Sequence, residues 1–300
     1  MRFTRSTQSQ RSSQRDFWSI IAASVFWGTV GIATQTLYTH STTNALSLAF
    51  FRLGIATPFF LVASIFLLGR RFWQIKPHDL IIMLGMGGMQ ALYQDSYNAA
   101  IGYTGVIVST LIALCVAPVI VALVSVFMAH ECLTRRTLIA LICALGGTML
   151  LVIARSQPGK QNISLLGILF ALLAASGYAV FILCGQQLAN RYHPLHVNTV
   201  AFSTGALLLF LLSIPTKLVV TYPAWEWLIL LYLGCIPTAL AYWLFQNGMR
   251  SLSATVVSII TLCEPLTAAL LAWLLFHEQL NLFGLLGAGL LLGTILLLAL

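Results

Sequence analysis

The sequence predicts an all-α membrane protein with ten transmembrane helices, arranged as two inverted five-helix repeats around a central cavity. The first observation is composition: of the 300 residues 59% are hydrophobic and only 7% charged, with a mean hydropathy of +0.94. A soluble domain carries about 25% charged residues, so an ordinary soluble enzyme and a disordered protein are both excluded. The second observation is the length of the apolar runs, which suits helices, since the alternating segments of a membrane barrel are absent. The third is an internal repeat.

A helix needs roughly 20 residues to cross the apolar core of a bilayer. Apolar runs between polar, Pro or Gly breaks predict ten spans: 17–37, 45–68, 79–101, 104–127, 134–154, 164–189, 195–213, 225–246, 252–275 and 281–299. The turn between the third and fourth spans is placed near Gly102 to Gly105. The organisation is then a cytoplasmic polar tail (1–16), a first repeat (17–154), an outer connecting loop (155–163) and a second repeat (164–300), with no room for a soluble domain.

The distribution of Lys and Arg predicts the orientation. With the N-terminus inside, eleven basic residues fall on the inner side: Arg2, Arg5, Arg11, Arg15, Arg70, Arg71, Lys76, Arg135, Arg136, Arg191 and Arg250. Three fall outside, namely Arg155, Lys160 and Lys217. The positive-inside rule therefore places both termini in the cytoplasm of a multi-pass protein of the inner or plasma membrane. The same rule explains the net charge of +8 without nucleic acid, which we do not expect as a partner.

The second half of the chain resembles the first at fixed offsets. At +151, the matches are Trp27 with Tyr178, Gln35 with Gln186, Phe51 with Phe202, Gly54 with Gly205 and Phe59 with Phe210. At +147, Pro118 matches Pro265 and the pair His130-Glu131 matches His277-Glu278. Five spans per half is an odd number, so the second copy is inverted. Inverted repeats place a binding site near the midplane between the halves and permit alternating access.

At these residues the chain resembles the drug/metabolite transporter superfamily, EamA type, over nearly its whole length. The resemblance rests on Val25-Phe26-Trp27-Gly28, Phe51-Arg52-Leu53, Ala117-Pro118, and Glu264-Pro265 followed by Trp273 and His277-Glu278. It implies a basket of helices around a cavity lined by spans one, three, four, six, eight and nine, and export of amino acids, metabolites or drugs. The second repeat departs from the first in having Tyr178 in place of Trp and Ser203 in place of Arg52.

Three charged residues lie inside predicted spans, where each needs a partner or a wet cavity. Arg52 and Asp95 both lie roughly 10 Å below the outer surface on neighbouring spans. This depth predicts an ion pair, serving either structure alone or as a gate or handle for a zwitterion.

Glu264 lies at the middle of the ninth span, beside Pro265. The missing N–H of Pro265 should free a carbonyl near Thr261, and we expect helix breaks at both Pro118 and Pro265. Glu264 is either a neutral structural group or a carboxyl that titrates and couples transport to protons, and the second interpretation is favoured.

Polar and aromatic side chains in other spans predict the cavity wall. Gln90, Tyr93, Gln94, Tyr97 and Asn98 share one face of the third span, which favours a cavity over a polar seam between helices. Span eight has a shorter polar face, formed by Tyr242, Trp243, Gln246 and Asn247. Trp27 and Tyr178 either line opposite walls of the cavity or pack in the core.

Other patterns in the sequence predict no catalytic or metal site. The glycine run at 85–88 lacks the Lys of a phosphate loop, and the His-Glu pairs lack zinc-binding spacing. The six cysteines lie mostly in apolar runs as buried thiols. Gly289 and Gly293 form a small-residue face for packing or dimer contact.

We therefore expect a secondary transporter, not an enzyme, that needs no cofactor or metal and acts in the lipid bilayer as a monomer or homodimer. Its small-molecule substrate would be an amino acid or a similar zwitterionic or amphipathic metabolite, exported by antiport that a proton gradient can drive. The alternatives are a nucleotide-sugar or sugar-phosphate carrier, for which only Arg52 is available to hold a phosphate, and a flippase for lipid-linked substrates.

Overall fold

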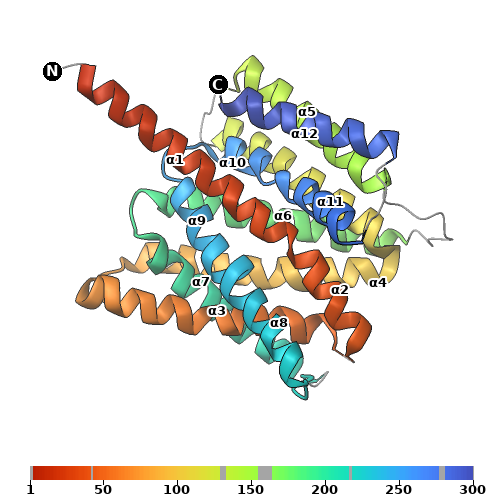
Figure 1. Cartoon of the computed structure of the whole chain (residues 1–300). Coiled ribbons are helices and arrows are strands. Elements are labelled where there is room, and N and C mark those ends of the chain that lie inside the picture. The colour runs from red at the N-terminus through yellow and green to blue at the C-terminus, as the bar shows by residue number, and fades with distance from the viewer. Residues whose placement is uncertain are drawn as a thin grey trace.

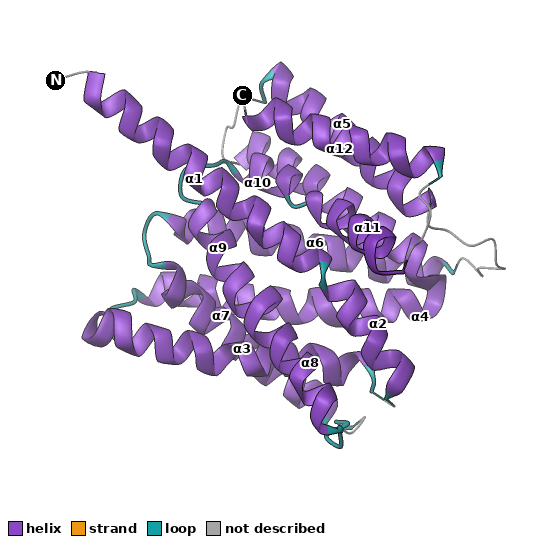
Figure 2. Cartoon of the chain, in the orientation of Figure 1, coloured by secondary structure: helices purple, strands orange, loops and turns teal. Residues whose placement is uncertain are grey.

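The computed structural model describes residues 3–41, 43–128, 133–154, 164–215, 218–276 and 281–299. Within these ranges the chain is almost entirely helical and contains no strand (Figure 2), which confirms the predicted all-α class. The elements are α1 (Phe3–Gly28), α2 (Val30–His40), α3 (Ala45–Leu68), η1 (Gly69–Trp73), α4 (Pro77–Met128), α5 (Arg135–Ala154), α6 (Leu165–Ala189), α7 (Pro194–Ser213), α8 (Ala224–Gly234), η2 (Cys235–Leu240), α9 (Ala241–Gly248), α10 (Ala254–Ile260), α11 (Cys263–Phe276) and α12 (Leu282–Ala299).

Nine helical segments in the described part of the chain are long and apolar enough to cross a membrane. The predicted third span, 79–101, is also helical, but polar residues such as Gln90 and Gln94 keep it from qualifying by hydropathy. It forms the first half of α4. At Gly105 the backbone takes φ 80° and ψ 167°, a conformation that favours glycine, and the chain reverses. The hydroxyl groups of Tyr97 and Thr110, on either side of the reversal, lie 2.7 Å apart, so the predicted turn is confirmed.

Residues 3–16, part of the predicted polar tail, are helical and belong to α1, which continues into the first span. One predicted helix break, at Pro118, is absent: α4 continues through Pro118, and the non-helical backbone in α4 is at Gly105. Pro58 likewise lies inside α3. In the middle of a helix, a proline leaves one carbonyl without its usual donor, and neighbouring helices can compensate for this loss inside a membrane.

Three other spans are interrupted. The first breaks at Thr29, between α1 and α2, and the ninth at Thr261 and Leu262, between α10 and α11. The eighth contains η2, a π-helical stretch around Pro237 that separates α8 from α9. Such interruptions are typical of functional sites in membrane helices, because they leave backbone groups available away from the regular ladder.

Figure 1 shows the helices packed as one bundle, with α5 and α12 side by side along one edge and α3, α7 and α8 along the other. Helices α4 and α6 pack together between these edges, and α1 crosses the front of the bundle. The α5–α12 contact is close: a Cβ on Gly147 would lie 2.8 Å from the carbonyl oxygen of Gly287. Gly289 and Gly293, predicted to pack, have no atom within 4 Å of the point where a Cβ would lie, so Gly287 takes that role within the chain.

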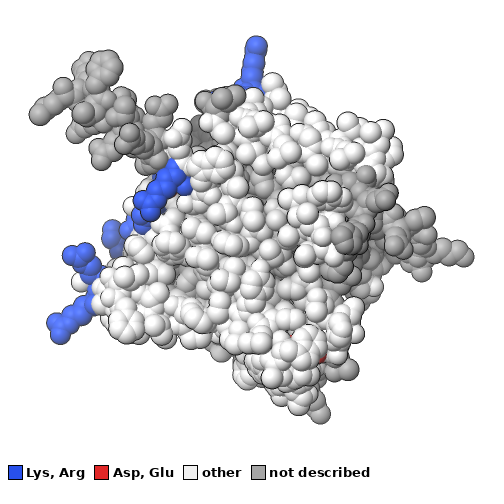
Figure 3. Space-filling view, in the orientation of Figure 1, with Lys and Arg blue, Asp and Glu red and all other residues white. Residues whose placement is uncertain are grey.

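The surface of the bundle is largely apolar, with Leu, Ile and Phe side chains exposed along most helices. The described Lys and Arg side chains gather mostly at one end of the helices, along the left edge of Figure 3. We call this the basic end and define it by Arg70, Arg71, Lys76, Arg191 and Arg250. A charge-poor apolar belt with basic residues at one end is the distribution expected of a multi-pass membrane protein.

Candidate functional site

Aromatic and amide side chains from four spans, the first, third, sixth and eighth, converge within the bundle. The ring of Trp27 on α1 lies 4.9 Å from that of Tyr242 on α9, and Tyr93 on α4 lies 5.3 Å from Tyr178 on α6. Gln90 Nε2 donates a hydrogen bond of 2.9 Å to the hydroxyl of Tyr242. The aromatic and amide groups predicted for the cavity wall are therefore neighbours, although they lie far apart along the chain.

Two charged groups join this cluster. Arg52 on α3 and Glu264 on α11 are both partly buried and lie within electrostatic range of each other. Glu264 also interacts electrostatically with Tyr93, Tyr97, Tyr178 and Tyr242. Arg52 interacts with Tyr93 and Tyr242, and its buried Nε has no hydrogen-bond partner. We call the following set the central site: Trp27, Arg52, Gln90, Tyr93, Tyr97, Tyr178, Tyr242 and Glu264.

The break in the ninth span places Glu264 at the start of a helix. Its own N–H donates to the carbonyl of Thr261 at 3.0 Å, so this carbonyl is bonded and not free as expected. The hydroxyl of Ser24 on α1 donates to the carbonyl of Ile260 at 3.4 Å. The first span crosses here: a Cβ on Gly28 would lie 2.9 Å from the carbonyl oxygen of Glu264. Two interrupted helices therefore meet at the acidic residue of the site.

The structure does not form the predicted ion pair between Arg52 and Asp95. The Asp95 side chain is exposed, and within the described part of the chain the charged partner within range of Arg52 is Glu264. The physical reason is rotation about the helix axis. Asp95 lies at the edge of the polar face of α4, and from there its carboxyl group points away from the tyrosines on that face.

The remaining predicted residues of α4 extend the polar face away from the basic end. Gln94 is buried, whereas Tyr97 and Asn98 are partly exposed. Asn98 Nδ2 donates to the carbonyl of Ala45 at 3.4 Å, near the start of α3. Exposure along this face thus rises from the fully buried Gln90 toward the end opposite the basic one.

On α9, Gln246 Nε2 donates to the carbonyl of Gly185 on α6 at 2.9 Å, while its Oε1 is buried without a partner. Trp243 is partly exposed and packs against the edge of the core. The sequence pattern did not single out Phe245, whose ring lies 5.1 Å from Trp27 and supports it. The indole Nε1 of Trp27 is buried and has no partner, so the site holds a hydrogen-bond donor available to a ligand.

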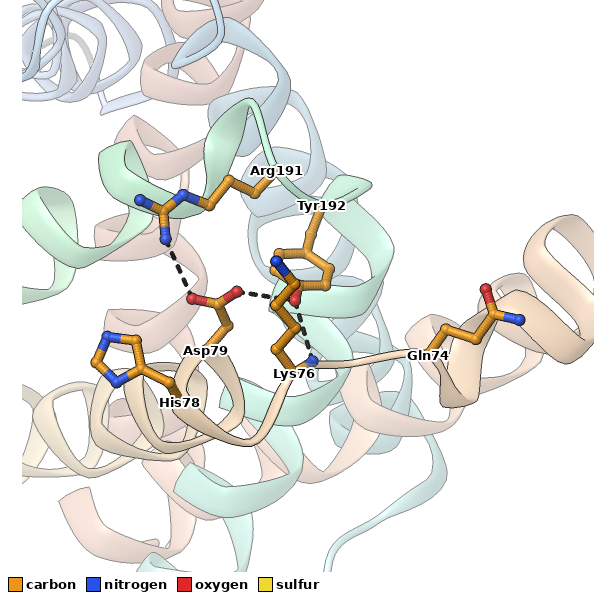
Figure 4. A pocket seen from close by; sticks show the side chains of 6 residues that line it. All are labelled: Gln74, Lys76, His78, Asp79, Arg191 and Tyr192. Carbon is orange, nitrogen blue, oxygen red and sulfur yellow. Dashed lines mark hydrogen bonds and ion pairs between the residues drawn. The ribbon is translucent and has the colours of Figure 1, made fainter.

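A second polar cluster lies at the basic end and was not predicted. Asp79 at the start of α4 accepts a 3.2 Å bond from Arg191 Nη1 and a 2.8 Å bond from the hydroxyl of Tyr192 (Figure 4). The Lys76 N–H donates to the same hydroxyl at 3.1 Å. Burial, with the hydrogen bond and charge of Asp79, raises the pKa of Tyr192 and keeps its hydroxyl a donor. We call Asp79, Arg191 and Tyr192 the basic-end cluster.

The basic-end cluster borders a hollow of about 560 Å³, lined also by Gln74, Lys76 and His78. In the sequence, Arg191 had stood out only as a topological charge. One feature of the sequence could have indicated this cluster: Asp79 is an acidic residue in the first turn of a helix that begins with Pro77. The predicted topology places it on the same side of the membrane as the short turn that contains Arg191.

Several predicted features fall outside the described residues: the pairs His130-Glu131 and His277-Glu278, the loop 155–163, and Cys132. The thiols of Cys115, Cys143, Cys184, Cys235 and Cys263 are free. Within the ranges that the structure covers, no three His, Cys, Asp or Glu side chains are grouped to hold a metal ion.

Comparison with known proteins agrees with this architecture. The sequence profile of the EamA-like transporter family matches residues 16–153 and again 165–300. The uncharacterized transporter YwfM of Bacillus subtilis is 29% identical over 87% of this chain and 86% of its own length. The uncharacterized inner membrane transporter YicL of Salmonella typhimurium is 27% identical over 96% of both chains. A crystal structure with a TM-score of 0.79 and 20% identity covers 96% of both chains and shares the fold.

Proposed function

The chain belongs to the EamA-like transporter family, and from this premise we propose that it exports small zwitterionic metabolites, such as amino acids, in exchange for protons. The observation that carries the proposal is the presence of one cation and one carboxyl group, Arg52 and Glu264, among the tyrosines of a single buried cluster. Membership of the family makes the protein a multi-pass membrane transporter. The substrate class, the coupling ion and the direction of transport are what we propose.

The charges of the central site fit a zwitterion. The guanidinium of Arg52 has an unpaired buried N–H that a substrate carboxylate can accept from, which is a charge-assisted contact. Glu264 can hold the ammonium group, and the rings of Trp27, Tyr93 and Tyr178 offer faces for an ammonium group or an apolar side chain. A sugar phosphate would be less well matched, because a second cation is not found in this cluster among the described residues.

Exchange follows from competition at Glu264. A carboxyl group that holds a proton carries no charge and no longer attracts an ammonium group. A carboxylate that holds the ammonium group leaves no place for the proton. If the site changes sides only when Glu264 is occupied by one or the other, proton entry and substrate exit are coupled. Moving an unoccupied, charged Glu264 carboxylate through the bilayer during the change of sides is costly, so the site should change sides only when Glu264 holds a proton or a substrate.

The direction of export depends on the orientation. We place the basic end and both termini in the cytoplasm of the inner or plasma membrane, because Lys and Arg are retained on that side. Figure 3 gives the charge distribution that supports this placement. The partners in this proposal are the small-molecule substrate and the lipid bilayer, and the chain acts as a monomer or a homodimer.

The test uses purified protein in lipid vesicles and a panel of radiolabelled neutral amino acids. The wild type should exchange at least one of them across the membrane and accumulate it when a pH gradient is imposed. Glu264→Gln removes titration while keeping size and hydrogen bonding, so exchange between equal pools should remain and accumulation should be lost. Asp95→Asn, which removes an exposed carboxyl outside the central site, is the matched control.

Three results would count against the proposal. Unchanged accumulation by Glu264→Gln removes the coupling role. Full activity of Arg52→Gln removes the carboxylate contact. Absence of any amino acid exchange by the wild type, with sugar phosphates or lipid-linked sugars transported instead, replaces the substrate class.

A further inference from the structure

The basic-end cluster joins the two repeats. Asp79 belongs to the first repeat and begins α4, which carries Tyr93 of the central site. Arg191 and Tyr192 belong to the second repeat and follow α6, which carries Tyr178. The Asp79 carboxylate is 5% exposed, so water competes weakly at the acceptor of both bonds, although the Arg191 side chain that donates one of them is 59% exposed. At this end of the molecule, the helices flanking the central site are therefore held together.

The internal repeat assigns a counterpart to each member of this cluster. At +147, the offset that relates Pro118 to Pro265, Asp79 corresponds to Glu226 at the start of α8. The same offset relates Gly87 to Gly234, and both glycines make equivalent close contacts: Gly87 with α7 at Ala201, and Gly234 with α3 at Ile55. The offset therefore describes a real structural correspondence between spans three and eight.

At +151, the offset between spans one and six, Arg191 corresponds to His40 and Tyr192 to Ser41. The matches Gln35–Gln186 and Phe51–Phe202 flank this segment on both sides, so no insertion shifts it. Glu226 begins α8 and His40 ends α2, both at the end opposite the basic one. The ring of His40 already lies 5.4 Å from that of Trp225, the neighbour of Glu226.

The two ends differ in the structure. Glu226 is 1% exposed, yet neither carboxyl oxygen has a hydrogen-bond partner. His40 Nδ1 interacts with the carbonyl of Thr36 at 3.0 Å and the hydroxyl of Thr39 at 2.8 Å, and Ser41 donates to Leu37 at 2.8 Å. A buried carboxyl without a partner is unfavourable, so a conformation that supplies a partner to Glu226 gains the free energy of that contact.

We propose that Asp79 and Glu226 are equivalent gate acids of the two repeats, and that this structure has the basic-end gate closed and the Glu226 gate open. In the opposite conformation Asp79 separates from Arg191 and Tyr192, and Glu226 binds His40 and Ser41. The second gate has fewer bonds, since the Lys76 N–H that supports Tyr192 corresponds to Pro223, which has no N–H. The inference rests on the proposed transport function but is tested without a substrate.

The experiment measures distances between spin labels on the full-length protein in lipid vesicles, in a background with the native cysteines replaced. One label pair at exposed positions 74 and 190 reports on the basic end, and a second pair at exposed positions 39 and 220 reports on the other. In Asp79→Asn and in Arg191→Gln, the population with a long 74–190 distance and a short 39–220 distance should rise about fivefold, because each removes a charge-assisted bond between the buried Asp79 carboxylate and the exposed Arg191 side chain.

Glu226→Gln and His40→Gln should shift the same equilibrium the other way, toward the conformation of the present structure. Their combination should do no more than either alone, since both remove one contact. Asp95→Asn serves as the control and should leave both distance distributions unchanged. The proposal is overturned if the basic-end variants change only the 74–190 pair, or if Glu226→Gln and His40→Gln have additive or no effects. Because no transport is measured, these outcomes are independent of whether amino acids are the substrate.

Discussion

Gly28 is the position where a single methyl group should disturb the central site most directly. A Cβ there would lie 2.5 Å from Thr267 Cβ, 2.8 Å from Thr267 Cγ2 and 2.9 Å from the carbonyl oxygen of Glu264. Since ordinary contacts begin near 3.4 Å, Gly28→Ala requires α1 and α11 to separate by about 1 Å. Overpacking of this kind costs about 1–3 kcal/mol in stability.

The assay is thermal unfolding of the purified protein in detergent, compared with transport in vesicles. Gly31→Ala is the matched control, because it adds the same methyl group three residues away, where a Cβ would meet no atom within 4 Å. We expect Gly28→Ala to lower Tm by several degrees relative to Gly31→Ala and to reduce exchange, since Glu264 moves with α11. Adding Thr267→Gly should recover part of the loss but not all, because the carbonyl of Glu264 remains in the way. Equal Tm values for the two alanine variants would refute the contact and the crossing it implies.

Three further predictions follow from particular contacts. Tyr242→Phe leaves Gln90 Nε2 buried without an acceptor and should destabilise the protein by about 1–3 kcal/mol; Gln90→Leu added to it should restore part of the lost Tm, and purely additive losses would contradict the bond. Burial, and next the charges of Arg250 and His196, lower the pKa of His193, and its neutral Nδ1 accepts a hydrogen bond from the N–H of Leu195. The stability that neutral His193 contributes is therefore complete above about pH 6.5 and is lost as pH falls and the imidazole is protonated. The Tm of His193→Asn should fall less than that of the wild type between pH 7 and pH 5, and parallel curves would argue against this role. Gln157→Cys, in a thiol-free background, should be labelled by an impermeant reagent from outside intact cells, and labelling only after permeabilisation would reverse the orientation.

Much of the fold could be predicted because the membrane imposes simple rules on length and composition. Apolar runs predicted ten spans, nine of which qualify by length and hydropathy in the described part of the chain, and the glycines near 102–105 predicted the turn at Gly105. The polar face of the third span was also readable, since Gln90, Tyr93 and Tyr97 recur with helical spacing. These polar side chains also explain why the third span does not qualify by mean hydropathy, although its apolar run predicted it.

The partner of Arg52 could not be predicted in the same way. Depth along a span follows from counting residues, but the direction in which a side chain points depends on how the helix is rotated against its neighbours. Asp95 and Arg52 share a depth, yet Asp95 is exposed and Glu264 is the acid near Arg52. Pro118 failed for a related reason: a proline predicts a lost hydrogen bond, whereas the backbone geometry depends on the packing around it.

The pairing of α5 with α12 bears on how the protein is made. Gly147, on the fifth span of the first repeat, packs against Gly287, on the fifth span of the second. During synthesis the face of α5 around Gly147 therefore waits in lipid, without its partner, until four further spans have left the ribosome and α12 has entered the membrane. The first repeat cannot complete its packing before the second one exists, although the two repeats match the same family profile. Assembly of this transporter is consequently a joint property of both repeats, and α12 closes a contact begun when α5 was made.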